Sequence, residues 1–218
     1  GDRPDLLQKV IPNYPPAAKR MLRDNGIWAR TLKRDNVRLV TDRITRITAD
    51  GVSTDAGAYP LDVLVLATGF QASHFLMPMT VKGRGGVDLH EQWAGDARAY
   101  LGMTIPGFPN LFCLYGPNTN IVVNGSIIFF SECSINYIMD SIRRLLAEKR
   151  RTMECREDVF WAYNREIDDA NHNMAWGASN VHSWYKNDLG RVSQNWPYTL
   201  REYWQRTQEV TPSDFVFA

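Results

Sequence analysis

The sequence has few cysteines, no long apolar run and almost no net charge. Its three cysteines, Cys113, Cys133 and Cys155, form no C-x-x-C pair, which argues against a disulfide scaffold or a zinc site and favours a reducing cytoplasm. No apolar run approaches the roughly 20 residues that a membrane-spanning helix needs. The net charge of +1 gives no global reason to expect a nucleic acid or a membrane surface as partner.

Several strong motifs are also missing. The 218 residues contain no G-x-G-x-x-G turn, no P-loop and no G-x-S-x-G elbow. The four histidines, His74, His90, His172 and His182, are scattered without ligand spacing, so we expect no metal. Gly1 is not a natural start, and we expect that an upstream segment is absent.

The charges are distributed unevenly along the chain. Residues 1–50 carry 11 Lys/Arg against 6 Asp/Glu, whereas the remainder carries 14 against 18. The basic opening segment is either a solvated face or a site for an anionic group such as a phosphate.

The pattern of apolar residues predicts alternating strands and helices. We expect a short helix over Ala17–Leu22, a strand over Asn36–Val40, and a hairpin that joins Arg43–Thr48 to Val52–Thr54 through the Asp50-Gly51 turn. The nearly continuous apolar runs Leu61–Ala67 and Pro109–Tyr115 favour strands buried on both faces.

Two longer helices follow. Ser126 is a candidate cap for a helix reaching about Lys149, whose apolar residues recur at three- and four-residue spacing. A second helix is predicted over Glu157–Met174, and an aromatic, loop-rich tail ends the chain. Together these elements predict an α/β nucleotide-binding architecture. A complete enzyme with two dinucleotide domains carries its own pyrophosphate-binding turns, so the chain looks incomplete.

Four local patterns, in a fixed order, resemble the class B flavoprotein monooxygenases of the Baeyer–Villiger type. They are Tyr14-Pro15-Pro16-Ala17-Ala18-Lys19-Arg20, Asp62-Val63-Leu64-Val65-Leu66-Ala67-Thr68-Gly69-Phe70, Gly107-Phe108-Pro109-Asn110-Leu111-Phe112 continuing to Gly116-Pro117-Asn118-Thr119, and Ser183-Trp184-Tyr185. The tail, with Gly190-Arg191-Val192 and Trp196-Pro197, looks most like the 4-hydroxyacetophenone monooxygenase branch.

The resemblance implies the C-terminal parts of a flavoprotein with two Rossmann-like domains, one for FAD and one for NADP, whose N-terminal half is absent. Residues 1–60 would close the NADP-binding domain. Residues 61–218 would form the C-terminal part of the FAD-binding domain, with the long helix and the aromatic-rich tail. The implied cofactors are FAD and NADPH, and the implied reaction inserts one oxygen atom of O2 into a small-molecule ketone to give an ester or lactone.

The resemblance also assigns roles to two cationic residues. Arg20 would be catalytic, because a fixed guanidinium stabilises negative charge that develops on oxygen at any working pH. Lys19 would meet the 2′-phosphate of NADPH. The alternatives are a surface arginine on a short helix and a solvated lysine.

Further residues are implied to line the cofactors and the substrate. The cofactor-binding candidates are Thr68, Gly69, Gly116, Pro117, Asn118, Thr119 and Trp184. The candidates for the substrate pocket are Ile121, Val122, Val123 and Asn124. A tight domain crossover at Thr68–Gly69, an ordinary turn at Gly116–Asn120, a core loop at Ile121–Asn124 and a core tryptophan at Trp184 are the structural alternatives.

Three other functions remain open on the residues alone. An N- or S-oxygenating flavin monooxygenase shares the class, and a flavin disulfide reductase shares the Ala-Thr-Gly strand but needs a redox cysteine pair elsewhere. The third is a non-catalytic binding or assembly fragment, which we expect to self-associate because a part of a domain exposes apolar surface. We expect the isolated fragment to be inactive.

Overall fold

The chain folds into two compact units. The computed structural model describes residues 3–21, 23–123 and 125–218. The first unit comprises Gly1–Asn13 and Met21–Phe70, and the second comprises Tyr14–Arg20 and Gln71–Ala218. The short segment Tyr14–Arg20 therefore packs with the second unit, although the chain on both sides of it belongs to the first. The assignment of residues 1–60 and 61–218 to NADP- and FAD-binding domains stays a prediction.

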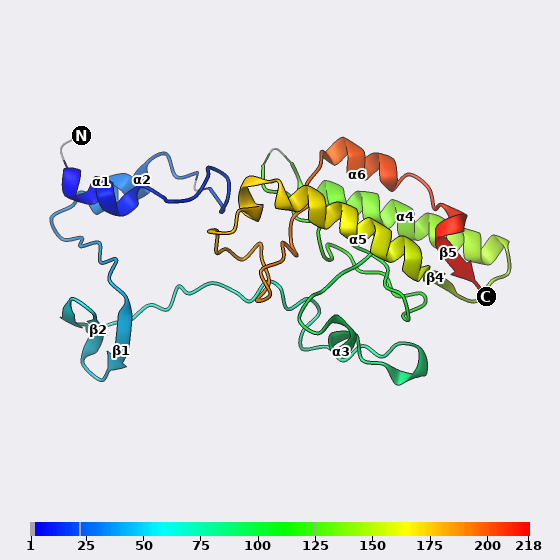
Figure 1. Cartoon of the computed structure of the whole chain (residues 1–218), viewed down its shortest axis with the longest axis horizontal. Coiled ribbons are helices and arrows are strands. Elements are labelled where there is room, and N and C mark those ends of the chain that lie inside the picture. Colours follow the sequence, from blue (N-terminus) through cyan, green and yellow to red (C-terminus); the bar gives the residue numbers. More distant parts are fainter. Residues whose placement is uncertain (1–2, 22, 124) are drawn as a thin grey trace. The chain divides into compact units, whose positions relative to one another are not determined.

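The first unit holds two short helices and an antiparallel meander (Figure 1). The helices are α1 (Pro4–Val10) and α2 (Ile27–Leu32), and the strands are β1 (Ile44–Thr48), β2 (Gly51–Thr54) and β3 (Gly57–Pro60). Thr48 pairs with Gly51 across the turn between β1 and β2, which confirms the predicted hairpin. The third strand was not foreseen.

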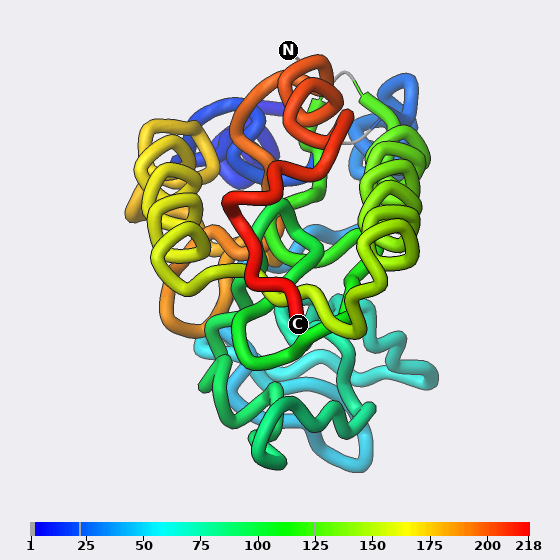
Figure 2. The backbone as a smooth tube through the Cα atoms, turned by 90° about the vertical axis from the view of Figure 1, so that its right-hand side faces the viewer, coloured from blue at the N-terminus to red at the C-terminus, as the bar shows by residue number. Residues whose placement is uncertain are grey.

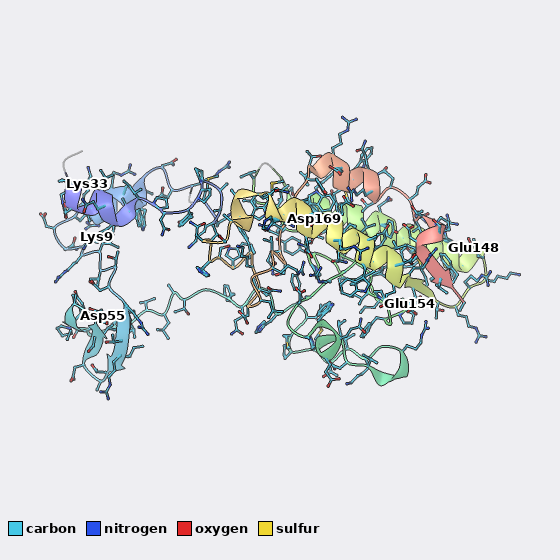
Figure 3. The ribbon with its side chains drawn as sticks, viewed as in Figure 1. Lys9, Lys33, Asp55, Glu148, Glu154 and Asp169 are labelled. Atoms are coloured by element: carbon cyan, nitrogen blue, oxygen red, sulfur yellow. The ribbon has the colours of Figure 1, made fainter. Side chains whose placement is uncertain are left out.

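The first unit has no core of its own in the part of the chain that the structure describes. None of its described residues is buried, and Ile44 and Ile47 of β1 are 62% and 59% exposed. Figure 3 labels Lys9 and Lys33 on this unit, and the Lys9 ammonium donates to the Leu39 carbonyl at 3.3 Å. Because burial of apolar area is the main force for folding, this unit needs further surface to pack against.

The predicted buried strand over Leu61–Ala67 is wrong for this chain. The segment forms no strand, and Val63, Val65 and Leu66 are 75%, 79% and 71% exposed. The composition suits a strand between two neighbours, but a parallel strand exists only with partners beside it, and no other described segment pairs with this one.

Two other local predictions are also wrong. Residues 36–40 form no strand, and residues 17–21 form no helix but begin in a turn, with Leu22 outside the described residues. The Ala18 amide donates to the Pro15 carbonyl at 3.1 Å, and Ala17 has a φ of 64°. This is the geometry of a type II turn, in which proline takes the second position and the third has positive φ.

The second unit is mainly helical with a small two-stranded sheet. Figure 2 shows the lime and yellow helices α4 and α5 on either side of the green and red segments. Its elements are η1 (Arg84–Gly86), α3 (Leu89–Trp93), α4 (Ile127–Ala147), β4 (Met153–Cys155), α5 (Glu157–His172), η2 (Ala175–Gly177), α6 (Leu200–Arg206), η3 (Pro212–Asp214) and β5 (Phe215–Phe217).

Strands β4 and β5 pair antiparallel, and Figure 3 labels Glu154 on β4. The Glu154 carboxylate accepts a hydrogen bond from the Gly107 amide at 2.8 Å and forms an ion pair with Arg84. The small sheet is thus connected to the irregular middle of the chain.

The predicted strand over Pro109–Tyr115 is an irregular loop. Asn110 and Tyr115 have φ angles of 60° and 53°. Such positive values lie outside the β region, so the backbone cannot continue as a strand at either residue. The Cys113 amide donates to the Met103 carbonyl at 2.9 Å, and the Cys113 side chain is buried. The apolar run is buried as predicted only in part, since Leu114 is 52% exposed.

Helix α4 confirms the predicted long helix and its cap. The Ser126 hydroxyl accepts from the Phe129 amide at 3.4 Å, at the start of a helix of 21 residues. Helix α5 confirms the second prediction, ending at His172 in place of Met174. No helix in the described ranges is long and apolar enough to cross a membrane.

The apolar residues of α4 do not all face inward. Its buried face consists of Phe130, Cys133, Ser134, Tyr137 and Ser141. The outer stripe is 40–74% exposed and consists of Ile128, Ile135, Met139, Ile142 and Leu146. We call these five residues the outer stripe of α4. A stripe of this kind is typical of a helix with a second packing partner.

A cluster centred on Arg191 connects four segments of the second unit. The guanidinium donates to Asn118 Oδ1 at 3.0 Å and to Asp168 Oδ1 of α5 at 3.1 Å, and it also contacts Asp96 and the Ala97 carbonyl. Arg98 completes the cluster, at 2.8 Å from Asp96 and 2.6 Å from Asp168.

The Arg191 side chain is only 11% exposed. Burial raises the pKa of Asp96, but the charges of Arg191 and Arg98 outweigh burial and hold that pKa below its usual range. The cluster is therefore a set of mutually compensated charges, in which the loss of one member leaves others unmatched.

We expect Arg191→Met to lower the free energy of unfolding by about 2–4 kcal/mol, because it leaves partly buried carboxylates without their main partner. Denaturation by urea followed by tryptophan fluorescence measures this. The exposed Arg201 of α6 provides the control, and Arg201→Met should change stability by less than about 0.5 kcal/mol.

The difference in the free energy of unfolding between wild type and Arg191→Met should also depend on pH. Since the pKa of Asp96 is lowered in the folded state, its contribution is present above the unfolded pKa and is lost as the pH falls through the folded value. The difference between wild type and Arg191→Met should shrink on acidification. A difference that stays constant from neutral pH down to pH values near about 3 would contradict this account.

Candidate functional site

Arg20 and the loop after residue 116 lie together within the second unit. The Arg20 guanidinium donates to the Val122 carbonyl at 3.5 Å, the upper limit of a hydrogen bond. Arg20 is itself exposed, so its charge stands at the surface of the unit. The structure thus brings the predicted catalytic arginine to the predicted substrate-pocket segment.

Lys19 lies beside the same turn. Its ammonium stands 4.6 Å from the centre of the Tyr14 ring, a cation–π contact within one short segment. The type II turn at Pro15–Ala18, whose Ala18 is fully buried, anchors this segment. Lys19 and Arg20 therefore come directly after this turn and do not lie on a helix.

The segment Gly116–Asn120 is buried and tightly bonded to the tail of the chain. The amides of Asn118 and Asn120 donate to the carbonyls of Ser193 and Gln194 at 2.9 and 2.8 Å. The Asn118 side chain donates to the Val192 carbonyl at 2.7 Å, and Asn120 donates to Asn195 Oδ1 at 2.7 Å.

Two amides in this segment stay unused. The backbone N–H groups of Gly116 and Thr119 donate to no acceptor in the described part of the chain, although both residues are buried. Buried amides are nearly always paired in folded proteins. Gly116 and Thr119 are therefore the two positions of the predicted cofactor segment that have free backbone donors, whereas Pro117 has none and Asn118 has already used its own.

A close approach of two loops accounts for the glycine at position 116. A Cβ atom at Gly116 would lie 2.2 Å from the Gly102 carbonyl oxygen, and a Cβ at Gly102 would lie 2.1 Å from Thr119 Cγ2. Gly102 also has a φ of 72°, which disfavours other residues. The two glycines let the 116–119 segment pack directly on the neighbouring loop.

The positive charge of Arg20 influences the pKa of two tyrosines. Burial raises the pKa of both Tyr115 and Tyr185, and the positive charge of Arg20 opposes that increase in each. The Tyr115 hydroxyl donates to Asn120 Oδ1 at 2.7 Å. The Tyr185 hydroxyl is buried and has no partner among the described residues.

Trp184 lies next to Tyr185 in the chain and in space. Their ring centres are 4.6 Å apart, and Trp184 is 41% exposed, whereas Tyr185 is fully buried. Trp184 therefore has open surface for a ligand, as a closing aromatic residue requires.

The predicted pocket segment is mixed in its exposure. Val122 is 8% exposed and belongs to a buried cluster with Trp176, Tyr185 and Val192, whereas Val123 is 43% exposed. Ile121 is partly buried and packs against the main core. Asn124 lies outside the described residues.

Thr68 and Gly69 belong to the other unit. Both are exposed, and Gly69 has a φ of 87°, which glycine adopts readily. Their assignment to the cofactor stays a prediction.

Sequence reasoning missed the two residues that organise this region. Arg191 and Tyr185 stand inside quoted motifs, Gly-Arg-Val and Ser-Trp-Tyr, but only Trp184 received a role. The long separation in sequence between Arg191 and Asn118, which are bonded here, has no local pattern that reveals it. No cluster of three or more His, Cys, Asp or Glu residues suited to a metal occurs in the described ranges.

Sequence comparison places the chain beside flavin monooxygenases. It is 38% identical to an uncharacterised monooxygenase of Sinorhizobium fredii, with 98% of this chain and 32% of that protein aligned. An FAD-binding monooxygenase of Aspergillus niger is also 38% identical, over 99% of this chain and 36% of that protein. A Baeyer–Villiger monooxygenase of Pseudomonas aeruginosa is 32% identical, over 89% and 37%. No family model matches the chain.

Structural comparison agrees with this relationship. An oxidised steroid monooxygenase bound to NADP superposes with a TM-score of 0.84 at 31% identity, covering 99% of this chain and 42% of that one. A complex of the monooxygenase OTEMO with FAD and NADP gives a TM-score of 0.86 at 26% identity, covering 100% and 41%. The chain has the fold of the C-terminal parts of Baeyer–Villiger and steroid monooxygenases, as its sequence predicted, and its homologues are flavin monooxygenases. It spans about a third to two fifths of the length of the relatives it matches.

Proposed function

We propose that the chain acts as the C-terminal part of a longer FAD- and NADPH-dependent monooxygenase, which inserts one atom of O2 into a ketone to give an ester or lactone. The observation that carries this proposal is the contact of Arg20 with the Val122 carbonyl, which joins a fixed positive charge to an apolar segment. The first unit, which has no buried residue among those described, supports a role within a longer protein.

The residues present fit a flavin. The backbone N–H groups of Gly116 and Thr119, which donate to no acceptor in the described part of the chain, would suit the polar edge of an isoalloxazine ring or a ribityl chain. FAD bound there supplies the oxygen-activating chemistry. Arg20 stabilises the negative charge on the reacting oxygen, and the guanidinium stays charged at any working pH. Trp184, which is partly exposed, would hold the nicotinamide end of NADPH. Thr68 and Gly69 are proposed as further cofactor-binding residues.

The substrate is a small ketone beside Ile121, Val122, Val123 and Asn124. The apolar character of the first three suits an aromatic or aliphatic ketone, and the tail motifs favour one of the 4-hydroxyacetophenone kind. Three cysteines that are free and buried fit a cytoplasmic location.

We expect Lys19→Ala, in the full-length protein, to raise KM for NADPH about ten- to a hundredfold with little change for NADH, since it removes the charged partner of the 2′-phosphate. Steady-state kinetics with both nucleotides measure the split. The exposed Lys149 gives the matched control, and Lys149→Ala should leave both constants unchanged. An equal loss for NADPH and NADH would remove Lys19 from the phosphate site.

Arg20→Ala tests the proposed reaction. Ester formation should fall by about a hundredfold or more, while oxidation of NADPH continues without ester product. Product analysis by gas chromatography, together with oxygen consumption, separates the two. Arg201→Ala is the control. Ester formation at a near wild-type rate would contradict the role of Arg20. Wild-type protein that oxygenates sulfides or amines but forms no ester would favour the N- or S-oxygenating alternative.

For the chain expressed alone, we propose self-association without catalysis. The outer stripe of α4 offers exposed apolar surface to a second copy. Light scattering should show oligomers, and Ile135→Glu should shift them toward monomer. Arg143→Gln changes the charge of the same helix in the same direction but removes no apolar surface, and it should have no effect. A monomer at all concentrations would contradict the proposal.

A further inference from the structure

The Tyr185 hydroxyl is a buried polar group that the proposed mechanism does not use. Tyr185 is fully buried, and its hydroxyl oxygen has no hydrogen-bond partner among the described residues. A phenol hydroxyl both donates and accepts, and a buried one usually has a partner. The missing partner therefore points to a group that reaches the hydroxyl in another state of the site.

The neighbourhood of this hydroxyl identifies a candidate partner. Tyr185 packs in one buried cluster with Val122, whose carbonyl accepts from the Arg20 guanidinium at 3.5 Å. That contact is at the limit of hydrogen-bond distance, and a guanidinium has five N–H donors to place. The guanidinium is thus weakly held where it stands, and the residue that it contacts packs against Tyr185.

Electrostatics supports the same pairing. Burial raises the pKa of Tyr185, and among the described residues Arg20 is the charged group that opposes the increase. The other tyrosine near Arg20, Tyr115, already donates its hydroxyl to Asn120. Of the two, Tyr185 is the one whose hydroxyl is still free to pair.

We propose that Tyr185 is a positioning residue for Arg20, whose guanidinium moves from the Val122 carbonyl to the phenol oxygen of Tyr185. In that position the phenol oxygen accepts an N–H of Arg20, while the remaining N–H groups stay available to an oxyanion. No covalent step is involved. The consequence for catalysis rests on the proposed function, but the pairing itself does not.

The pairing is tested on the 218-residue chain, labelled with carbon-13 at the tyrosine Cζ. The resonance of Tyr185 is assigned by its loss in Tyr185→Phe and is followed to high pH in wild type and in Arg20→Met. We expect the midpoint of Tyr185 to move to higher pH in Arg20→Met, because a positive charge beside the phenolate is lost.

Tyr137 is the internal control. Its hydroxyl is also buried without a partner among the described residues, and no arginine is among the main causes of its raised pKa, so its resonance should be the same in both proteins. If alkali unfolds the chain before Tyr185 ionises, the Cζ shift at neutral pH is compared instead, since a charged donor on the phenol oxygen changes it. Identical Tyr185 behaviour in wild type and Arg20→Met, by whichever readout applies, overturns the proposal.

The functional arm uses the full-length protein. Tyr185→Phe should lower kcat for ketone oxygenation about tenfold and leave KM for NADPH within about twofold, as expected for a group that acts in the transition state through Arg20. Tyr137→Phe should leave kcat unchanged. A general loss of stability would affect both constants and the melting temperature, which circular dichroism reports. If the protein oxygenates no ketone, the proposed function fails, while the resonance experiment still decides the pairing.

Discussion

The second unit depends on the compensation of charge around Arg191. This guanidinium reaches Asp96, Asp168 and Asn118 and the Ala97 carbonyl, which lie on separate loops and on α5. The loops between residues 95 and 120 contain little regular secondary structure, so hydrogen bonds within strands and helices do not fix them. Their positions are set instead by a few charge-assisted contacts with well-defined geometry.

The candidate site is built on this arrangement. Asn118 receives Arg191 on its oxygen and donates to the Val192 carbonyl with its nitrogen, so the segment from Gly116 to Asn120 is oriented from both sides. The unused amides of Gly116 and Thr119 are directed by bonds that their neighbours make. The chemistry proposed for the site therefore depends also on Arg191 and Val192, which have no proposed contact with cofactor or substrate.

The sequence predicted the parts whose structure is locally encoded. Ser126 as a cap and the spacing of apolar residues predicted α4, and Asp50-Gly51 predicted the hairpin. Leu61–Ala67 shows the limit of such reasoning. Its apolar composition is typical of a strand that pairs with a neighbour on each side, and no described segment of this chain pairs with it. Pro15-Pro16-Ala17-Ala18 shows another: proline starts turns as well as helices, and the positive φ of Ala17 decides between them.

The site residues likewise divide into those that local motifs predicted and those that depend on contacts between distant segments. The motif order pointed to Lys19, Arg20 and the 116–124 segment, and the structure brings Arg20 to Val122. Tyr185 and Arg191 act through contacts between segments far apart in the chain, and a single sequence carries no periodicity that reports such pairs. The structure reveals them because the buried Tyr185 hydroxyl has no described partner and the Arg191 guanidinium has several.

The membership of Tyr14–Arg20 in the second unit determines what holds the Arg20 charge in place. Arg20 and the Val122 carbonyl that it contacts belong to the same unit, so this contact does not require the first unit. Preorganisation of this charge is therefore a property of one unit, set by contacts that lie wholly inside it.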